Sequence, residues 1–147
     1  MEVSFSEILK SGKSRGEKAR LIADKIRLSM GYSWVGIYDV SEKEIKFISC
    51  AGRSEPLIPS FPKDKGLNGR AVTQGKTVIV NDIEKDEDYL LTFTDTKSEI
   101  VAPIFGKTSK QIVGTIDVES EKVNAFDDED VKFLEACAKK ISELWSG

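Results

Sequence analysis

Histidine is absent from this chain of 147 residues, and cysteine occurs only twice. Without histidine, the chain cannot build a Ser-His-Asp or Cys-His nucleophile arrangement or a metal site with histidine ligands. The two cysteines, Cys50 and Cys137, lie far apart in the sequence and form no C-x-x-C pair. This spacing argues against a disulfide scaffold and a thiolate zinc site, and it predicts a cytoplasmic protein in a reducing environment.

Long apolar runs and basic runs are missing as well. No stretch has the length of a transmembrane helix and the N-terminus shows no signal-peptide pattern, so we expect no membrane contact. The net charge is -3, and no cluster of lysine or arginine offers a footprint for nucleic acid. With 39% hydrophobic and 32% charged residues the composition is that of a globular protein, and we expect residues 1–147 to form one domain.

Three acidic side chains occur in two strand-like segments of the sequence. Over residues 111–119 the side chains alternate, so that Asp117 and Glu119 share one face. Glu99 opens the preceding segment, beside the apolar run 100–102. Acids in such strands face either water on a half-exposed antiparallel sheet or the interior of a site, and the alternation allows both.

A further segment, residues 33–40, places two aromatic residues beside a glycine. Trp34, Gly36 and Tyr38 share a face, and a glycine between two large rings predicts a notch with aromatic walls. Both rings can equally be ordinary core residues. If this face meets the acids, the two form a pocket for a small ligand with an amino group and an apolar or polarisable end. A hard-cation site on Asp117, Glu119 and Glu99 stays open, but no loop with calcium-ligand spacing surrounds them, so we expect no metal. We also expect no cofactor.

Helix signals lie near both ends of the chain, with short strands between them. Ser14 begins an S-x-x-E capping box ahead of an apolar stripe that runs to Met30, and Asp127 is suited to cap the last helix. The strands come in hairpins. This order predicts an α+β fold, in which a central antiparallel sheet carries the N-terminal and C-terminal helices on one face.

Loops and short helices are expected to form the pocket on the other face of the sheet. The loop over residues 51–65 holds three of the four prolines and can act as a lid. A short helix is predicted over residues 70–74. Gly66 and Gly69, just before it, expose backbone N–H groups that can receive an anion such as a carboxylate. Their spacing is not that of a Walker loop or a dinucleotide fingerprint.

These segments resemble the GAF domain, and within that fold they are most similar to the free methionine-(R)-sulfoxide reductases. The order and spacing of the matching motifs hold from about Tyr32 to the C-terminal helix. The motifs are residues 33–38, 66–69 with 71–72, 75–83, 98–103, 114–119 and 126–130. Each motif is weak alone, but together they are specific for the fold.

The resemblance implies a pocket for free methionine sulfoxide. Trp34 and Tyr38 match the aromatic walls around the sulfoxide end. Glu99, Asp117 and Glu119 match the acids that hold the substrate and its amino group. The family has aspartate at the last of these positions, so Glu119 is a departure that reshapes the pocket.

The chemistry of that family does not carry over to this chain. Its reaction needs a cysteine thiolate that attacks the sulfoxide sulfur and a resolving cysteine that then forms a disulfide. The family's cysteine positions fall at Thr92, Asn68 and Ile58, none of which is cysteine here. A threonine hydroxyl has a far higher pKa than a thiol and is a poor reagent for sulfoxide sulfur. We therefore expect no catalytic residue.

Three functions stay open from the sequence. The first is a non-catalytic sensor or binding protein for a free amino acid or a similar amine, favoured because the pocket residues are kept while the thiols are absent. The second is a methionine-(R)-sulfoxide reductase, or another oxidoreductase, that uses Cys50 or no cysteine. The third is a structural or dimerisation module, because GAF domains often form homodimers through their terminal helices.

Overall fold

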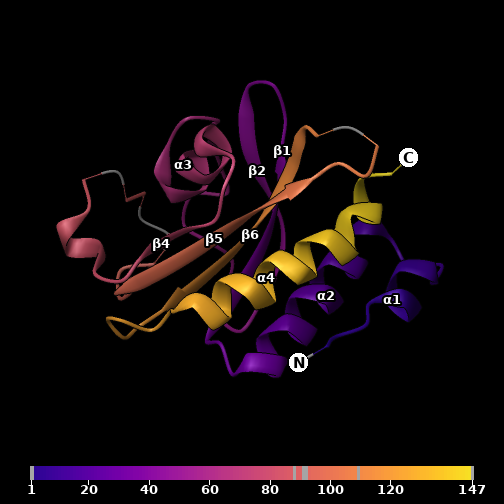
Figure 1. The fold of residues 1–147 in the computed structure, drawn as a ribbon, viewed down its shortest axis with the longest axis horizontal. Helices are drawn as coiled ribbons and strands as arrows, with labels where there is room; N and C mark the ends of the chain where they lie inside the picture. Colours follow the sequence, from indigo (N-terminus) through magenta and orange to yellow (C-terminus); the bar gives the residue numbers. More distant parts are fainter. Residues whose placement is uncertain (1, 88, 91–92, 109, 147) are drawn as a thin grey trace.

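Figure 1 shows the fold in a computed structural model, which describes residues 2–87, 89–90, 93–108 and 110–146. The elements follow in the order α1 (Ser6–Lys10), α2 (Arg15–Met30), β1 (Trp34–Val40), β2 (Glu44–Ala51), β3 (Ser60–Pro62), α3 (Gly66–Gln74), β4 (Val78–Val80), η1 (Ile83–Lys85), β5 (Ser98–Phe105), β6 (Ile112–Ser120), α4 (Asp128–Ile141) and η2 (Ser142–Trp145).

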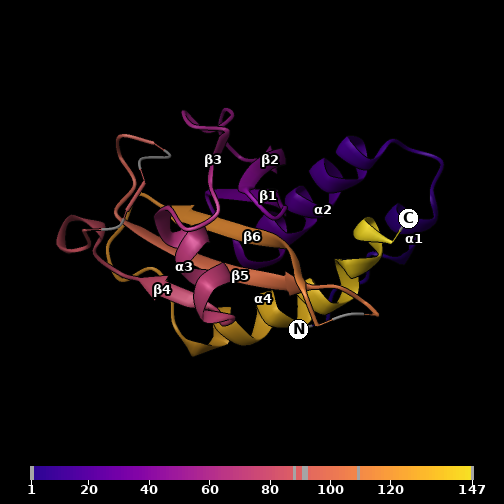
Figure 2. The same cartoon turned by 90° about the horizontal axis from the view of Figure 1, so that it is seen from above.

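The strands of the described residues form one antiparallel sheet in the order β3-β2-β1-β6-β5-β4. α2 packs on β1 and β2, and α4 packs on β5, so both long helices cover the same face. α3 packs on β5 and β6 from the opposite face, as the two views agree (Figures 1 and 2). The predicted α+β fold with the terminal helices on one face is therefore confirmed.

The two long helices begin where the sequence predicts. The Ser14 hydroxyl accepts a hydrogen bond from the Glu17 N–H at the start of α2, and Gly31 ends that helix in the left-handed conformation, with φ of 71°. At the start of α4, Asp127 and Asp130 form a reciprocal capping box. Within the described part of the chain, no helix is long and apolar enough to cross a membrane.

The core beneath the helices follows from side-chain alternation in the central strands. Val35 and Ile37 of β1, with Ile116 and Val118 of β6, point toward the helices and are fully buried. Burying each such side chain contributes about 1.5–3 kcal/mol. The residues between them point toward the opposite face. Strand geometry alone thus separates a helix-covered core from the face that carries the acids.

The structure departs from the predictions around the lid. α3 begins at Gly66 rather than at residue 70. β3 interrupts the expected proline-rich loop. Among the described residues it pairs only with β2. Prolines are tolerated at such an edge because one side of the strand needs no N–H donor.

Candidate functional site

Register places the acids in rows across three neighbouring strands. Trp34 on β1 pairs with Glu119 on β6, which in turn pairs with Glu99 on β5. In the next row Gly36 pairs with Asp117. Because paired residues of antiparallel strands point to the same face, all these side chains lie on the face that α3 and the lid loops cover.

The three carboxyl groups are buried next to one another. Glu99, Asp117 and Glu119 are exposed by 2%, 0% and 2%. One oxygen from each carboxyl lies within 4.8 Å of the others. The interpretation that these acids face water on a half-exposed sheet is therefore wrong. Like charges this close in a dry site repel strongly, so the three groups cannot all be ionised at low cost.

Protonation relieves this repulsion. Burial raises the pKa of Glu99 well above its usual value, and the charges of Asp117 and Glu119 raise it further. Burial also raises the pKa of Asp117, whereas hydrogen bonds from Glu99 and Asn68 oppose that rise. We infer that Glu99 keeps its proton to a higher pH than an ordinary glutamate and shares it with Asp117.

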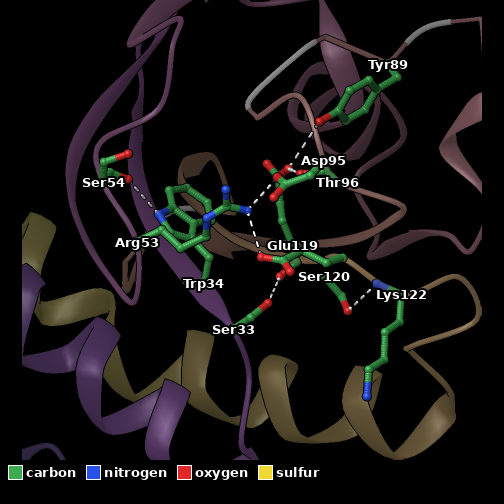
Figure 3. Close-up of polar contacts among 11 residues, drawn as sticks. Ser33, Trp34, Arg53, Ser54, Tyr89, Asp95, Thr96, Glu119, Ser120 and Lys122 are labelled. Carbon is green, nitrogen blue, oxygen red and sulfur yellow. Dashed lines mark hydrogen bonds and ion pairs between the residues drawn. The ribbon is translucent and has the colours of Figure 1, made fainter.

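Neutral donors hold two of the acids in place. The side-chain amide of Asn68 donates to Oδ2 of Asp117 at 3.2 Å. The hydroxyl groups of Thr96 and Tyr89 donate to Oε1 of Glu119 at 2.8 and 3.2 Å (Figure 3). Such bonds fix the orientation of a carboxylate and leave its charge in place.

Trp34 and Tyr38 lie on the same face as the acids, as packed rings. Both are buried in a cluster with Ile45, Phe61 and Phe93. The predicted notch at Gly36 is wrong, because the indole of Trp34 itself lies over this glycine and would collide with an added Cβ. The indole N–H donates to the backbone oxygen of Ser54 at 3.2 Å, which anchors the ring to the loop after β2.

Arg53 connects the loops that cover this face. Its Nη1 forms an ion pair with Asp95 at 2.6 Å (Figure 3). The same atom forms a second ion pair with Glu121 at 3.1 Å. The guanidinium lies 4.6 Å from the centre of the Phe93 ring, and that ring packs edge-on against Trp34 at 5.2 Å. We call these contacts the Arg53 clasp. Ion pairs this exposed are weak and sensitive to salt, so the clasp can open at small cost.

A small cavity lies between the acids and α3. Its lining includes Glu99, Tyr38 and the first turn of α3, residues 66–68, with Ile58 and Leu90 from the covering loops. The cavity has a volume of about 10 Å³, room for about one water molecule. A free amino acid is several times larger, so binding one requires the covering loops to move outward. A wider groove of about 1000 Å³ elsewhere contains none of the predicted site residues.

The five predicted ligand-binding residues take two kinds of position. Tyr38 and Glu99 line the cavity. Asp117 and Glu119 lie beside Glu99 but outside the lining, and Trp34 belongs to the aromatic cluster behind it. The structure thus brings the acids together and sets Tyr38 beside them.

Two of the three residues at the family's cysteine positions line this cavity. Asn68 and Ile58 both line it, whereas Thr92 lies outside the described residues. Sequence reasoning missed that Asn68 is a hydrogen-bond partner of Asp117. The Thr115 hydroxyl, which donates to Oδ1 of Asn68 at 2.5 Å, fixes that amide in the donating orientation. The alternation that put Thr115 on the acid face was the available signal.

Burial raises the pKa of both thiols of the chain. Burial raises the pKa of Cys50, whose sulfur lies 3.8 Å from the backbone oxygen of Ser54. Cys137 is buried in the helix-side core, and burial raises its pKa to about 11. A raised pKa lowers the fraction of thiolate, which is the reactive form.

The acids also form the kind of oxygen donor set that a hard cation prefers. Three carboxylate oxygens within 4.8 Å of one another could surround such an ion. The expectation that the site takes no metal stays a prediction.

The architecture and the enclosed acidic site define a class of α+β domains in which loops and a short helix close over one face of an antiparallel sheet. A model of the GAF domain family matches residues 14–145. Because this match spans most of the chain, the protein belongs to the GAF domain family.

Some relatives of this chain are named only for the GAF domain, and others are named as enzymes. The chain is 32% identical to GAF domain-containing protein A of Dictyostelium discoideum over 116 residues, which are 79% of this chain and 72% of that protein. It is 31% identical to the free methionine-R-sulfoxide reductase of Saccharomyces cerevisiae over 117 residues, 79% of this chain and 64% of that protein.

Solved structures point to the same relationship. The type II free methionine-R-sulfoxide reductase of Thermoplasma acidophilum superposes with a TM-score of 0.80 at 27% identity, covering 89% of this chain and 94% of that chain. The suspected resemblance to the reductase branch of the GAF family is thus confirmed.

Proposed function

We propose that this protein binds a free amino acid or a similar small amine at Glu99, Asp117 and Glu119, without cysteine chemistry. The observation that carries the proposal is the burial of three carboxyl groups within 4.8 Å of one another. Among the described residues, no lysine or arginine forms an ion pair with Glu99 or Asp117. An ammonium group would replace the shared proton and remove the repulsion between the acids.

The family relationship supports a particular candidate ligand. Two of the relatives named above are free methionine-R-sulfoxide reductases. Free L-methionine-(R)-sulfoxide is therefore the first ligand to test. Its ammonium group would contact the acids, and its apolar end would contact the aromatic cluster of Trp34 and Tyr38. A sensing role and a homodimer through the terminal helices remain predictions.

The absence of suitable thiols supports binding without turnover. The residues at two family cysteine positions, Asn68 and Ile58, line the cavity and carry no thiol. Neither Cys50 nor Cys137 lines it. The chain therefore brings no nucleophilic sulfur to a sulfoxide bound in this cavity.

Equilibrium dialysis against L-methionine-(R)-sulfoxide, its S epimer and L-methionine tests the proposal. We expect saturable binding of at least one of them, and loss of binding in Asp117→Ala but not in Glu44→Ala, which changes an exposed acid of β2. The same samples, incubated with a thioredoxin-type reductant, should form no methionine. Binding that survives Asp117→Ala would contradict the site, and methionine formation would favour the reductase alternative.

A further inference from the structure

The wide groove of about 1000 Å³ lies apart from the acids, between the turn that joins β1 to β2, the turn that joins β5 to β6, and α3 (Figure 1). We call it the turn groove. Val40 at the end of β1 and Val72 of α3 line it, and both also pack on the aromatic cluster that contains Tyr38. Because these lining residues are attached to the core, the groove is formed before any partner binds.

Phe105, at the end of β5, gives this surface an exposed apolar centre. Its side chain is 43% exposed, and it lines the turn groove together with two smaller hollows next to it. Pro62, Ile112 and Val113 extend the apolar lining of the groove. Contiguous apolar groups with an exposed aromatic ring are typical of surfaces that bind a partner, since contact with the partner removes them from water.

Lysines surround this apolar centre. Of the described residues, three acids line the groove and the two hollows that share Phe105, against six lysines, which are Lys43, Lys63, Lys76, Lys107, Lys110 and Lys139. The surface is therefore positive, although the whole chain has a net charge of -3. Within the described part of the chain, the three lysines of the groove itself, Lys43, Lys63 and Lys110, form no ion pair. Their ammonium groups are available to an anionic partner.

We propose that the turn groove binds an acidic peptide segment of a partner protein, with an apolar residue of the peptide on Phe105 and its carboxylates on the lysines. Lys43, Lys63 and Lys110 lie on three separate segments, so a partner that contacts all of them carries several negative charges along an extended chain. The net negative charge of the protein disfavours nucleic acid, because it repels the dense phosphate charge. This inference does not depend on the proposed function.

Fluorescence anisotropy with a labelled probe peptide tests the proposal. The probe carries a central Leu-Phe pair flanked on each side by a run of glutamates, and we expect saturable binding that weakens as salt is added. Control peptides with serine in place of the Leu-Phe pair, or in place of the glutamates, should bind about 10-fold more weakly. A thymidine oligonucleotide should not displace the probe. No binding of the probe, equal binding of either control or displacement by the oligonucleotide would overturn the inference.

Matched charge reversals locate the peptide on this surface. Lys63→Glu combined with Lys110→Glu, both at exposed positions of the groove, should weaken probe binding at least about 5-fold. Lys13→Glu combined with Lys132→Glu changes the net charge equally at exposed positions outside the groove and should bind as wild type. Phe105→Ala should weaken binding by about 10-fold. Equal affinities of the two double variants would overturn the assignment.

Sedimentation of the same proteins tests the other occupant of such a groove, a second copy of this chain. We expect the wild-type protein and the variant with Lys63→Glu and Lys110→Glu to have the same oligomeric state. A wild-type dimer that becomes a monomer in this variant would identify the second copy as the occupant and overturn the inference.

Discussion

Replacing Glu99 by glutamine removes an acid from the buried cluster and keeps the shape of its side chain. Burial and the neighbouring acids raise the pKa of Glu99 well above its ordinary value of 4.5. As the pH rises above about 4.5, the unfolded chain loses this proton while the folded protein keeps it. The folded state then binds more protons than the unfolded state, and the free energy of unfolding falls as the pH rises.

The size of the effect follows from proton linkage. Each retained proton lowers the free energy of unfolding by about 1.4 kcal/mol per pH unit until the pH passes the pKa of the folded state. Between pH 5 and pH 7, Glu99 should therefore cost the wild-type protein up to about 3 kcal/mol. Because the pKa of Asp117 is also raised, a smaller slope should remain in Glu99→Gln.

Urea unfolding at pH 5, 6 and 7 measures this slope. Trp34, which is fully buried, provides a fluorescence signal for the folded state. The wild-type protein should lose stability across this range, Glu99→Gln should lose clearly less, and Glu44→Gln, at an exposed position of β2, should behave as wild type. A Glu99→Gln protein with the wild-type slope would refute the assignment of the retained proton to this cluster.

Three further predictions follow from the packing of the site. Gly36→Ala sets a methyl group against the Trp34 indole and should lower the free energy of unfolding in urea by about 1–3 kcal/mol. Gly16→Ala in α2, where an added Cβ meets nothing within 4 Å, should instead raise it by about 0.5–1 kcal/mol. Equal effects of the two substitutions would contradict the contact between Gly36 and the indole. Arg53→Met opens the clasp and should speed ligand association in stopped-flow fluorescence; an unchanged rate would show that the clasp does not limit entry. Cys50→Ser should leave the dissociation constant within about 2-fold by calorimetry, and a 10-fold loss would implicate the thiol.

Side-chain alternation predicted that Asp117 and Glu119 share one face of β6 and that Trp34 and Tyr38 share one face of β1, because the period of a strand is fixed by its backbone. The same pattern could not predict how deeply the acids are buried. The acids are covered by α3 and by loops distant in sequence. The local sequence around Asp117 would therefore be the same on a solvent-exposed face and in a buried site. The resemblance to a known family supplied the choice that the alternation left open.

The sequence could not predict the position of the Trp34 ring or the structure of the covering segments, for a different reason. Gly36 indicates free space beside the strand, but the rotamer of Trp34 decides whether the ring fills it. β3 was read as loop because prolines are poor strand residues, and only its place at the sheet edge makes Pro62 acceptable. The start of α3 was misplaced because two glycines read as a loop, although Gly66, with φ of 72°, begins the helix.

Calorimetric titration of L-methionine-(R)-sulfoxide into the wild-type protein and into Asp117→Ala, side by side, measures directly whether the acids bind the amino acid. We expect a saturable heat for the wild-type protein that is absent from the variant. In buffers with different heats of ionisation, the wild-type heat should also reveal release of a proton from the acid cluster. No heat with the wild-type protein, or equal heats with both proteins, would contradict amino-acid binding at the acids.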